Sequence, residues 1–512
     1  MKVLHYFALH FLLLGITYAA PFITVWNTSI VDESNTNEPP AGQIKLGLTY
    51  GGVYDFTVDW GDDSTDYITT WDQTEITHSY AEDGIYEVRM EGTITGWRQK
   101  DAGALKLIEI SQWGNLKFKG SNYFENCVNL DITAIDAPDL TDVTDLSYGF
   151  QYSGITSANL SAWDMSRVTG LIQFFAHATK FNGDVSTWDV STVTTFYHTF
   201  NDNPEFNSDL SQWDTSSSTD MASMFTSGTA FNSDISQWDV SRVVDFSSAL
   251  RLCDNFNQNL NEWSVSSATD IKQMFAYSFS FNQDLIDWDV SNVQDMEYMF
   301  QANTYNQSLS KWDTSSVLNM KGMFHGVDSF EQDLSNWDTS SVTDMSEMFL
   351  YNDAFNHDLG GWDTSSVTDM TKMFENDIFH QDLSGWDTSS LEACANFKNR
   401  GCNPPGMIPL GCFDSCCSTQ VANSNYASAD SLNGEFGVTF EVICDELFTG
   451  GGNATCSDVT GQFTDMACAG ENSAPIYIYI YIYIYQTTHI PHALPQNYNL
   501  SVYQFSSLIY FN

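Results

Sequence analysis

The sequence predicts an α/β repeat solenoid, with one short strand and one short helix in each coil of 24–25 residues, preceded by a small β-sandwich. Three observations predict this arrangement. Tryptophan recurs at a nearly constant interval, an apolar run with helical spacing follows each tryptophan, and the region before the repeats alternates apolar and polar residues as a strand does.

The tryptophan period is the clearest of these signals, and a period of this length is typical of stacked coils. Consecutive tryptophans lie 25 residues apart except for two intervals of 24. Their shared phase with Phe and Leu predicts a core stack, with a sugar-binding platform as the alternative. The predicted core tryptophans are Trp163, Trp188, Trp213, Trp238, Trp263, Trp288, Trp312, Trp337, Trp362 and Trp386.

The unit that starts at Trp337 shows how one coil is predicted to fold. Val342, Met345, Met348 and Phe349 follow the i, i+3, i+6, i+7 spacing of one face of a short helix. The segment from Phe355 to Trp362 is predicted to be extended, as one short strand per coil. Both shortened repeats lose their residue between these two segments, which predicts a loop there.

A lone repeat buries too little apolar surface to fold by itself, so each coil must be stabilised by its neighbours. The ends of the stack therefore need caps. Residues 161–400 are predicted to form a solenoid of ten repeats, with degenerate capping repeats in residues 101–160. Residues 401–474 are predicted to form a Cys-rich cap or module stapled by disulfides.

Composition excludes several classes of partner. The formal net charge is -48, and such a surface repels nucleic acid and anionic membranes. Aromatic residues make up 14% of the chain and charged residues only 16%, so a disordered acidic tail is also excluded.

The first 20 residues are expected to be a signal peptide. Lys2 precedes an apolar run over residues 7–16, and small residues follow before Pro21. The run is too short for a transmembrane anchor, so none is expected. No cysteine follows the cleavage region to accept a lipid. We therefore expect a secreted or cell-surface protein.

An exported chain is expected to use clustered cysteines as disulfides. Zinc is the alternative, but the segment has no CxxC pair and no histidine between its first and last cysteine. Cys127 and Cys253 are expected to be buried thiols. The disulfide candidates are Cys394, Cys402, Cys412, Cys416, Cys417, Cys444, Cys456 and Cys468. Glycosylation candidates begin the sequons at Asn27, Asn159, Asn306, Asn453 and Asn499.

The repeat consensus WDTSSVTDMSxMFxxAxxFNxDLSxWD resembles the leucine-rich-repeat-like surface proteins of the BspA type, including the mycoplasma lipoprotein repeats. The resemblance covers roughly residues 105–400. It implies a surface-exposed adhesin or interaction protein, and it brings no catalytic residues. The chain departs from lipid-anchored members because no cysteine follows the signal.

Residues 21–100 are predicted to form the β-sandwich. The alternation of Tyr54, Phe56, Val58 and Trp60 is strand-like. The runs WGDDS, from Trp60, and HSYAEDGIY, from His78, resemble the marks of a PKD-type domain. This resemblance implies an extracellular spacer or interaction domain, although Asp63 stands where the motif usually has Gly.

Each repeat carries Asp at three phases, for instance Asp333, Asp338 and Asp344. Stacked coils would bring equal phases within about 5 Å of each other, where unpaired carboxylates repel. We expect these residues to accept backbone N–H bonds in Asx-turns. Bound calcium is the alternative, and no other cofactor is expected. The weak calcium candidates in the β-sandwich are Asp59, Asp62, Asp63 and Asp66.

The sequence favours a binding or adhesion protein over an enzyme, because no catalytic or phosphate-binding motif occurs. The expected partner is an extracellular protein or glycan ligand, and variable positions between Phe349 and Phe355 and their equivalents are expected to form the contact face. An extracellular carbohydrate-binding or matrix module is the alternative function, and an unrecognised hydrolase is a third. Residues 475–512 contain the run IYIYIYIYIY, and one hypothesis is that this low-complexity tail is a gene-model extension.

Overall fold

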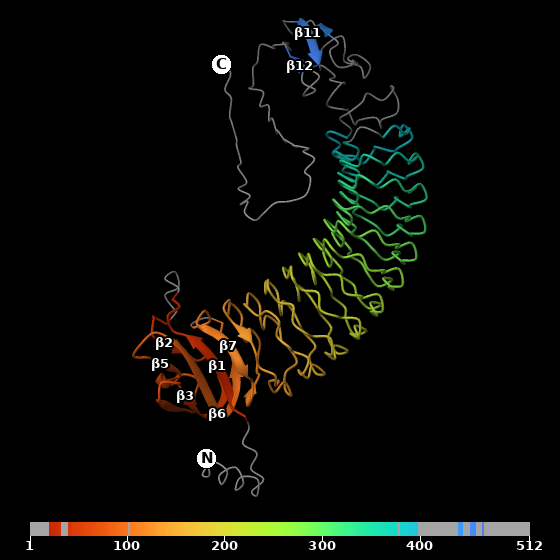
Figure 1. The fold of residues 1–512 in the computed structure, drawn as a ribbon. Coiled ribbons are helices and arrows are strands. Elements are labelled where there is room, and N and C mark those ends of the chain that lie inside the picture. The colour runs from red at the N-terminus through yellow and green to blue at the C-terminus, as the bar shows by residue number, and fades with distance from the viewer. Residues whose placement is uncertain are drawn as a thin grey trace, which may run out of the picture.

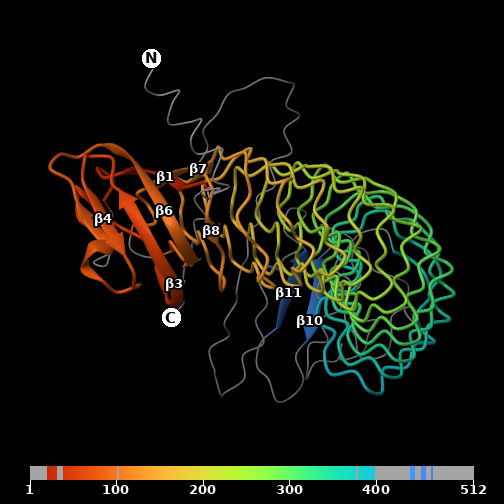
Figure 2. The ribbon, with the colours of Figure 1, turned by 90° about the horizontal axis from the view of Figure 1, so that it is seen from below.

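A computed structural model describes residues 20–31, 39–100, 103–375 and 379–397, together with three short strands near the C-terminus. A β domain at the N-terminus leads into a long, curved solenoid (Figure 1). Figure 2 shows that the coils follow one another from the β domain without interruption. The described residues contain no α-helix, and their one helical segment is the 3-10 turn η1, Thr74–Ile76.

The β domain is built on a mixed sheet whose strands run in the order β4-β3-β6-β1-β7-β9, with β8 pairing β6. Apolar residues on alternate positions of β3 and β6 point into the core, as the period of a strand requires. The strands are β1 (Phe22–Asn27), β3 (Leu48–Asp59), β4 (Thr65–Ile68), β6 (Ile85–Trp97), β7 (Leu107–Gln112), β8 (Leu116–Lys117) and β9 (Asp131–Ile132). A separate pair joins β2 (Gln43–Lys45) to β5 (Thr77–Ser79).

This sheet crosses the predicted boundary between residues 21–100 and the capping repeats. Strand β7 pairs with β1 of the β domain on one side and, in parallel, with β9 of the next coil on the other. Strand β8 likewise pairs in parallel with β6. The first coils are therefore extensions of the β domain's own sheet, which does not end at residue 100.

The prediction of one helix per coil is also wrong. The amides of Met345 and Glu347 donate to carbonyls of the next coil, at 2.9 and 2.8 Å, instead of to residues four positions back. The amide of Met348 donates to Met345 O at 3.3 Å, which closes a turn within the coil. Glu347, between them, has φ 59°, outside the helical region. The segment is a chain of turns bonded to its neighbour coil.

The predicted strand between Phe355 and Trp362 is absent from this described coil. Parallel bridges instead run through the third aspartate phase, as Asn319↔Asp344 and Asp344↔Asp369 show. Each is an isolated bridge one residue long, so the coil holds a point of pairing and no full strand. The α/β solenoid expected from the sequence is thus a helix-free solenoid of turns and β-bridges.

The core is a set of aromatic ladders that run through the stack. Trp337 lies 6.3 Å from Trp312 and 6.5 Å from Trp362 between ring centroids, with ring planes within 4° of parallel. These indoles are at most 4% exposed. Each also donates its Nε1–H to the preceding coil, as Trp362 does to Leu334 O at 3.0 Å. The tryptophans therefore join neighbouring coils by both packing and hydrogen bonding.

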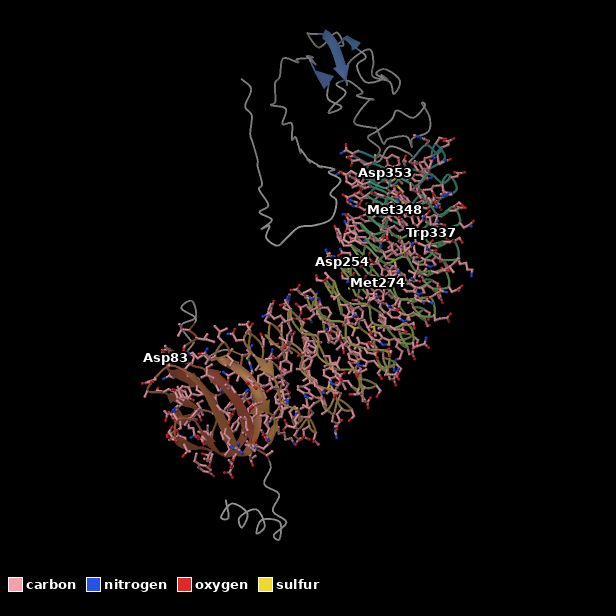
Figure 3. All side chains as sticks on the ribbon, viewed as in Figure 1. Asp83, Asp254, Met274, Trp337, Met348 and Asp353 are labelled. Atoms are coloured by element: carbon pink, nitrogen blue, oxygen red, sulfur yellow. The ribbon has the colours of Figure 1, made fainter. Side chains whose placement is uncertain are left out.

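A second ladder, of phenylalanines, is more tightly spaced and accounts for the curvature. Phe349 lies 5.7 Å from Phe324 and 5.4 Å from Phe374, closer than the neighbouring tryptophan pairs. Figure 3 shows Met348, which precedes Phe349, nearer the inner side of the arc and Trp337 nearer the outer side. The stack bends because neighbouring coils lie closer together at their hydrogen-bonded turns than at their tryptophans.

Edge-on rings end the ladders. Trp113 meets Trp163 at 83° near the N-terminal end, and Phe397 meets Phe374 at 77° at the C-terminal end. An edge-on ring offers no parallel face for another ring to stack on. Beyond it, β10 (Thr439–Ile443), β11 (Gly451–Cys456) and β12 (Phe463–Thr464) form an antiparallel sheet. The remaining residues of the predicted Cys-rich segment and tail lie outside the described residues.

Candidate binding surface on the concave side of the solenoid

Two columns of residues with positive φ follow the solenoid from coil to coil. The turn segment that replaces the predicted helix needs a left-handed residue at two phases, four positions apart. The first left-handed column contains Asn122, Tyr148, Gln173, His198, Ser223, Ser248, Gln273, Tyr298, Gly322, Glu347, Lys372 and Asn396. The second left-handed column contains Asn126, Tyr152, His177, Asp202, Ser227, Leu252, Tyr277, Ala302, Gly326 and Tyr351.

The second left-handed column borders the concave side of the arc. Asp353 follows Tyr351 by two residues, and Asp254 follows Leu252 by two. Figure 3 shows both aspartates on the inner side of the solenoid. Tyr351 is 53% exposed and Tyr152 is 43% exposed, so aromatic rings of this column reach solvent. This is also the stretch between Phe349 and Phe355 that the sequence predicts to be a contact face.

At the N-terminal end of the column, the ring of Tyr152 stacks on His177 with centroids 4.4 Å apart and planes 2° from parallel. His177 Nδ1 lies 2.9 Å from Asp202 Oδ2 in the following coil. A hollow of about 160 Å³ opens beside this pair, with Val128 and Lys180 in its wall. Its size suits one inserted side chain, since drug-sized ligands occupy about 300 Å³ or more.

Farther along the solenoid, residues of each column contact side chains of other coils. The guanidinium of Arg251 lies 5.5 Å from the ring centroid of Tyr277. Tyr298 donates its hydroxyl to Glu347 Oε2 at 2.8 Å, two coils away. A Cβ on Gly322 would come 2.0 Å from the Tyr298 ring, so glycine there lets the ring cross the intervening coil.

Tyr298, His325 and Glu347 form a cluster, and the ionisation of Tyr298 and His325 follows from their burial. Burial lowers the pKa of His325, although the charge of Glu347, 3.4 Å from its Nδ1, opposes the shift. Burial and the hydrogen bond to Glu347 both raise the pKa of Tyr298. His325 is therefore neutral and Tyr298 protonated near pH 7. The cluster presents fixed donors and acceptors, which suits recognition.

The repeated aspartates accept hydrogen bonds from the backbone two residues on. Asp333, Asp338 and Asp344 accept the amides of Ser335, Ser340 and Ser346 at 2.9, 3.0 and 2.8 Å. These are the Asx-turns expected from the sequence, although turns follow them instead of a helix. In the described part of the chain, no group of His, Cys, Asp or Glu is placed to hold a metal ion.

The calcium candidates of the β domain have separate hydrogen-bonding roles. Asp59 accepts the amide of Gly61 at 3.0 Å, and Asp66 accepts Trp60 Nε1 at 2.9 Å. Asp63 has φ 65°, in the left-handed region. Asp62 lies 2.9 Å from His78 Nε2. Burial raises its pKa, but hydrogen bonds from Ser64 and His78 outweigh burial and hold the pKa below 3.8.

The other predicted sites are structural or only partly described. All ten repeat tryptophans are buried. Cys253 is a buried free thiol, and Cys127 Sγ is buried 2.9 Å from Gln99 O. Cys394 is disulfide-bonded, whereas the side chains of the other disulfide candidates lie outside the described residues.

Among the sequon asparagines, Asn306 belongs to a ladder that joins coils. Its Oδ1 accepts the Glu331 amide at 3.1 Å, as Asn282 accepts that of Asn306 at 2.8 Å. Asn27 and Asn159 each accept a local amide, from Ser29 and Ser161. Asn453 lies in β11, and Asn499 is outside the described residues.

Sequence reasoning missed the two left-handed columns, although one coil carried their signal. Gly322 and Gly326 stand at the two phases in a single repeat. Other coils hold tyrosine, histidine, serine or leucine there, and these residues hide the backbone requirement. Two glycines four residues apart, such as Gly322 and Gly326, are the pattern that indicates two positions with positive φ in each coil.

The fold and this surface define a repeat protein of the solenoid class, with a rigid scaffold and a variable concave side. A family model described as Mycoplasma protein of unknown function, DUF285, matches residues 119–233, 195–308 and 295–401. These matches span more than half of the chain, so the protein belongs to this family. No curated protein and no solved structure matches the chain. Among the described residues, we find no helix long and apolar enough to cross a membrane.

Proposed function

We propose that this is a secreted or cell-surface binding protein whose solenoid presents its concave side to an extracellular protein. The contact surface comprises the exposed and partly exposed members of the second left-handed column and the cluster of Tyr298, His325 and Glu347. The BspA-type resemblance of the repeats and the PKD-type resemblance of residues 52–95 support an adhesion role. The signal-like N-terminus supports export.

One observation carries the proposal. Tyr152 and Tyr351 have φ 56° and 55° and are 43% and 53% exposed. A non-glycine residue in this conformation costs on the order of 1 kcal/mol, and an exposed ring offsets only part of that by burial and by contacts such as the stacking of Tyr152 on His177. Gly326 shows that the same column accepts glycine. Stability alone therefore does not explain the tyrosines, whereas tyrosine is favoured in protein interfaces.

The arrangement of the column also suits a protein ligand. Tyr152, Tyr277 and Tyr351 are spread over nine coils, which gives an extended and not a pocket-like site. Arg251 and Lys180 add positive groups to a strongly acidic chain. An elongated surface that mixes aromatic, acidic and basic groups matches the composition of protein interfaces better than that of an enzyme cleft.

The test compares partner capture by the intact chain and by the triple variant Tyr152→Ser, Tyr277→Ser, Tyr351→Ser. Purified chain is immobilised and exposed to extracellular and surface proteins, with and without calcium. A partner identified by mass spectrometry is then measured in purified form. We expect the triple variant to weaken its affinity by at least about 100-fold, because each interface tyrosine contributes about 1 kcal/mol or more.

The matched control is the double variant Val244→Ser, Leu318→Ser. These side chains are 43% and 45% exposed and lie outside both left-handed columns. The control should keep full affinity. Equal loss in both variants, or unchanged affinity in the triple variant, would refute the concave side as the contact surface.

A further inference from the structure

The β domain carries an aromatic pair that its own fold does not use. Tyr50 is 86% exposed and Trp71 is 40% exposed, and their rings meet edge to face at 5.8 Å. The two residues come from different segments, the start of β3 and the loop between β4 and η1. Large aromatic side chains left in solvent next to each other point to a ligand.

The backbone around Tyr50 is built to hold it outward. The pairing of β3 with β6 breaks between Leu48 and Val53, so residues 49–52 bulge from the sheet. Tyr54 Oη fixes this bulge, since it accepts the Thr49 amide and donates to Gly96 O, both at 2.8 Å. A Cβ on Gly52 would come 2.0 Å from that hydroxyl, so glycine is required there.

The loop that carries Trp71 is held by the amide group of Gln73. Gln73 Oε1 accepts the amides of Thr69 and Thr70 at 2.7 and 3.1 Å. Its Nε2 donates to Tyr67 O at 3.0 Å. This side chain therefore closes the loop from inside and leaves the indole at the surface. Both aromatics are thus presented on preorganised backbone, which reduces the entropy lost on binding.

A hollow of about 470 Å³ lies next to Trp71, within the range of small-molecule sites. Its lining includes Thr74, Thr77, Asp72 and Lys45, residues whose side chains carry hydroxyl, carboxylate and ammonium groups. Leu48 and Ile76 supply apolar surface. Donors and acceptors beside an aromatic face fit a sugar ring, whose C–H face stacks on the indole while its hydroxyls bond at the rim.

We propose that the hollow beside Trp71, whose indole meets the ring of Tyr50 edge to face, binds a pyranose unit of a neutral glycan. Trp71 supplies the stacking face, and Asp72, Thr74 and Thr77 bond the hydroxyls. The net charge of -48 opposes anionic glycans, which is why the ligand is neutral. A proline-rich peptide also stacks on aromatic rings, but its grooves are lined mainly by aromatic side chains, whereas the lining of this hollow includes a single aromatic residue, Trp71. The site is separate from the concave side of the solenoid.

The experiment is isothermal titration calorimetry on the full chain. The probes are hexamers of β-1,4-glucose, β-1,4-N-acetylglucosamine, β-1,4-mannose and β-1,4-galactose, with a decaproline peptide as the competing class. Tyr50→Ala and Trp71→Ala remove the two rings. Trp71→Tyr keeps a smaller stacking face. Phe279→Ala, at a 52% exposed ring on the solenoid, is the matched control.

At least one neutral hexamer should bind the native chain at millimolar concentration or below. Tyr50→Ala and Trp71→Ala should each weaken that affinity at least about tenfold, with Trp71→Tyr intermediate and Phe279→Ala unchanged. Thermal unfolding of each variant confirms that the domain is intact. Binding of decaproline alone, equal binding by Trp71→Ala, or no binding by any hexamer overturns the proposal.

Discussion

Replacing Ser227 separately by Gly and by Ala tests whether the left-handed columns store backbone strain. Ser227 has φ 64°, and its amide donates to Arg251 O of the next coil at 2.8 Å. Neither replacement carries a functional side chain, so the difference between the two variants isolates the backbone. A left-handed alanine costs about 1 kcal/mol more than a left-handed glycine. The Gly variant should therefore be the more stable by about 1 kcal/mol.

Gln237 provides the comparison, because it is exposed and lies outside the left-handed set. At an ordinary position glycine is less favourable than alanine, by about 0.5–1 kcal/mol in regular structure. The sign of the Gly–Ala difference should therefore reverse between the two sites. Equilibrium unfolding in urea, followed by tryptophan fluorescence, measures both differences. If alanine is as stable as glycine at residue 227, the strain argument for the exposed tyrosines is refuted.

Trp213→Ala should destabilise the chain by about 3–5 kcal/mol. Hydrogen exchange should show that the loss of protection is concentrated in the coils around Trp188 and Trp238. A uniform loss of protection along the stack would contradict coil-by-coil coupling. Asn232→Ala removes the acceptor of the Asn257 amide, 3.1 Å away, and should lower the free energy of unfolding by about 1 kcal/mol. Asn232→Asp keeps an acceptor and should lower it by less, as measured by the same urea unfolding. Burial and the nearby charge of Asp270 raise the pKa of Asp295, so its charged form costs stability. Asp295→Asn should therefore stabilise at neutral pH by less than about 1 kcal/mol, and thermal scans should show this gain fading as pH falls through the raised pKa toward 3.8. Chelating calcium should leave the melting temperature unchanged, since the described aspartates accept protein hydrogen bonds; a fall would support the calcium alternative.

The sequence predicted the stacking of coils but not the backbone within a coil. The regular spacing of Trp337 and its equivalents identifies the core, whether helices or turns connect these residues. The spacing of Met345, Met348 and Phe349 fits a helix, but it fits equally a chain of turns that buries the same side chains. What separates the two is the direction of the amides, and Met345 N donates to the next coil. Periodicity within one repeat carries no information about such bonds.

The candidate sites were predictable to different degrees for similar reasons. Variable residues between Phe349 and Phe355 predicted a contact face, but not the positive φ of this column, which accompanies amide bonds between coils such as that from Tyr152 N to Ala176 O at 2.9 Å. Local turn chemistry was easier, since Asp338 needs only Ser340 for its Asx-turn. The pairing of β1 with β7 joins residues about 85 positions apart in sequence, beyond the reach of local patterns. The pair of Tyr50 and Trp71 likewise forms only through the bulge in β3.

The antiparallel pairing of β1 with β7 has a consequence for truncated proteins. A chain that begins at the first coil would present β7 with a bare row of N–H and C=O groups along one side. Such an exposed strand is a template for another copy, so end-to-end polymers become accessible. In the intact chain β1 occupies that position. The β domain thus keeps the solenoid from growing into a filament at that end.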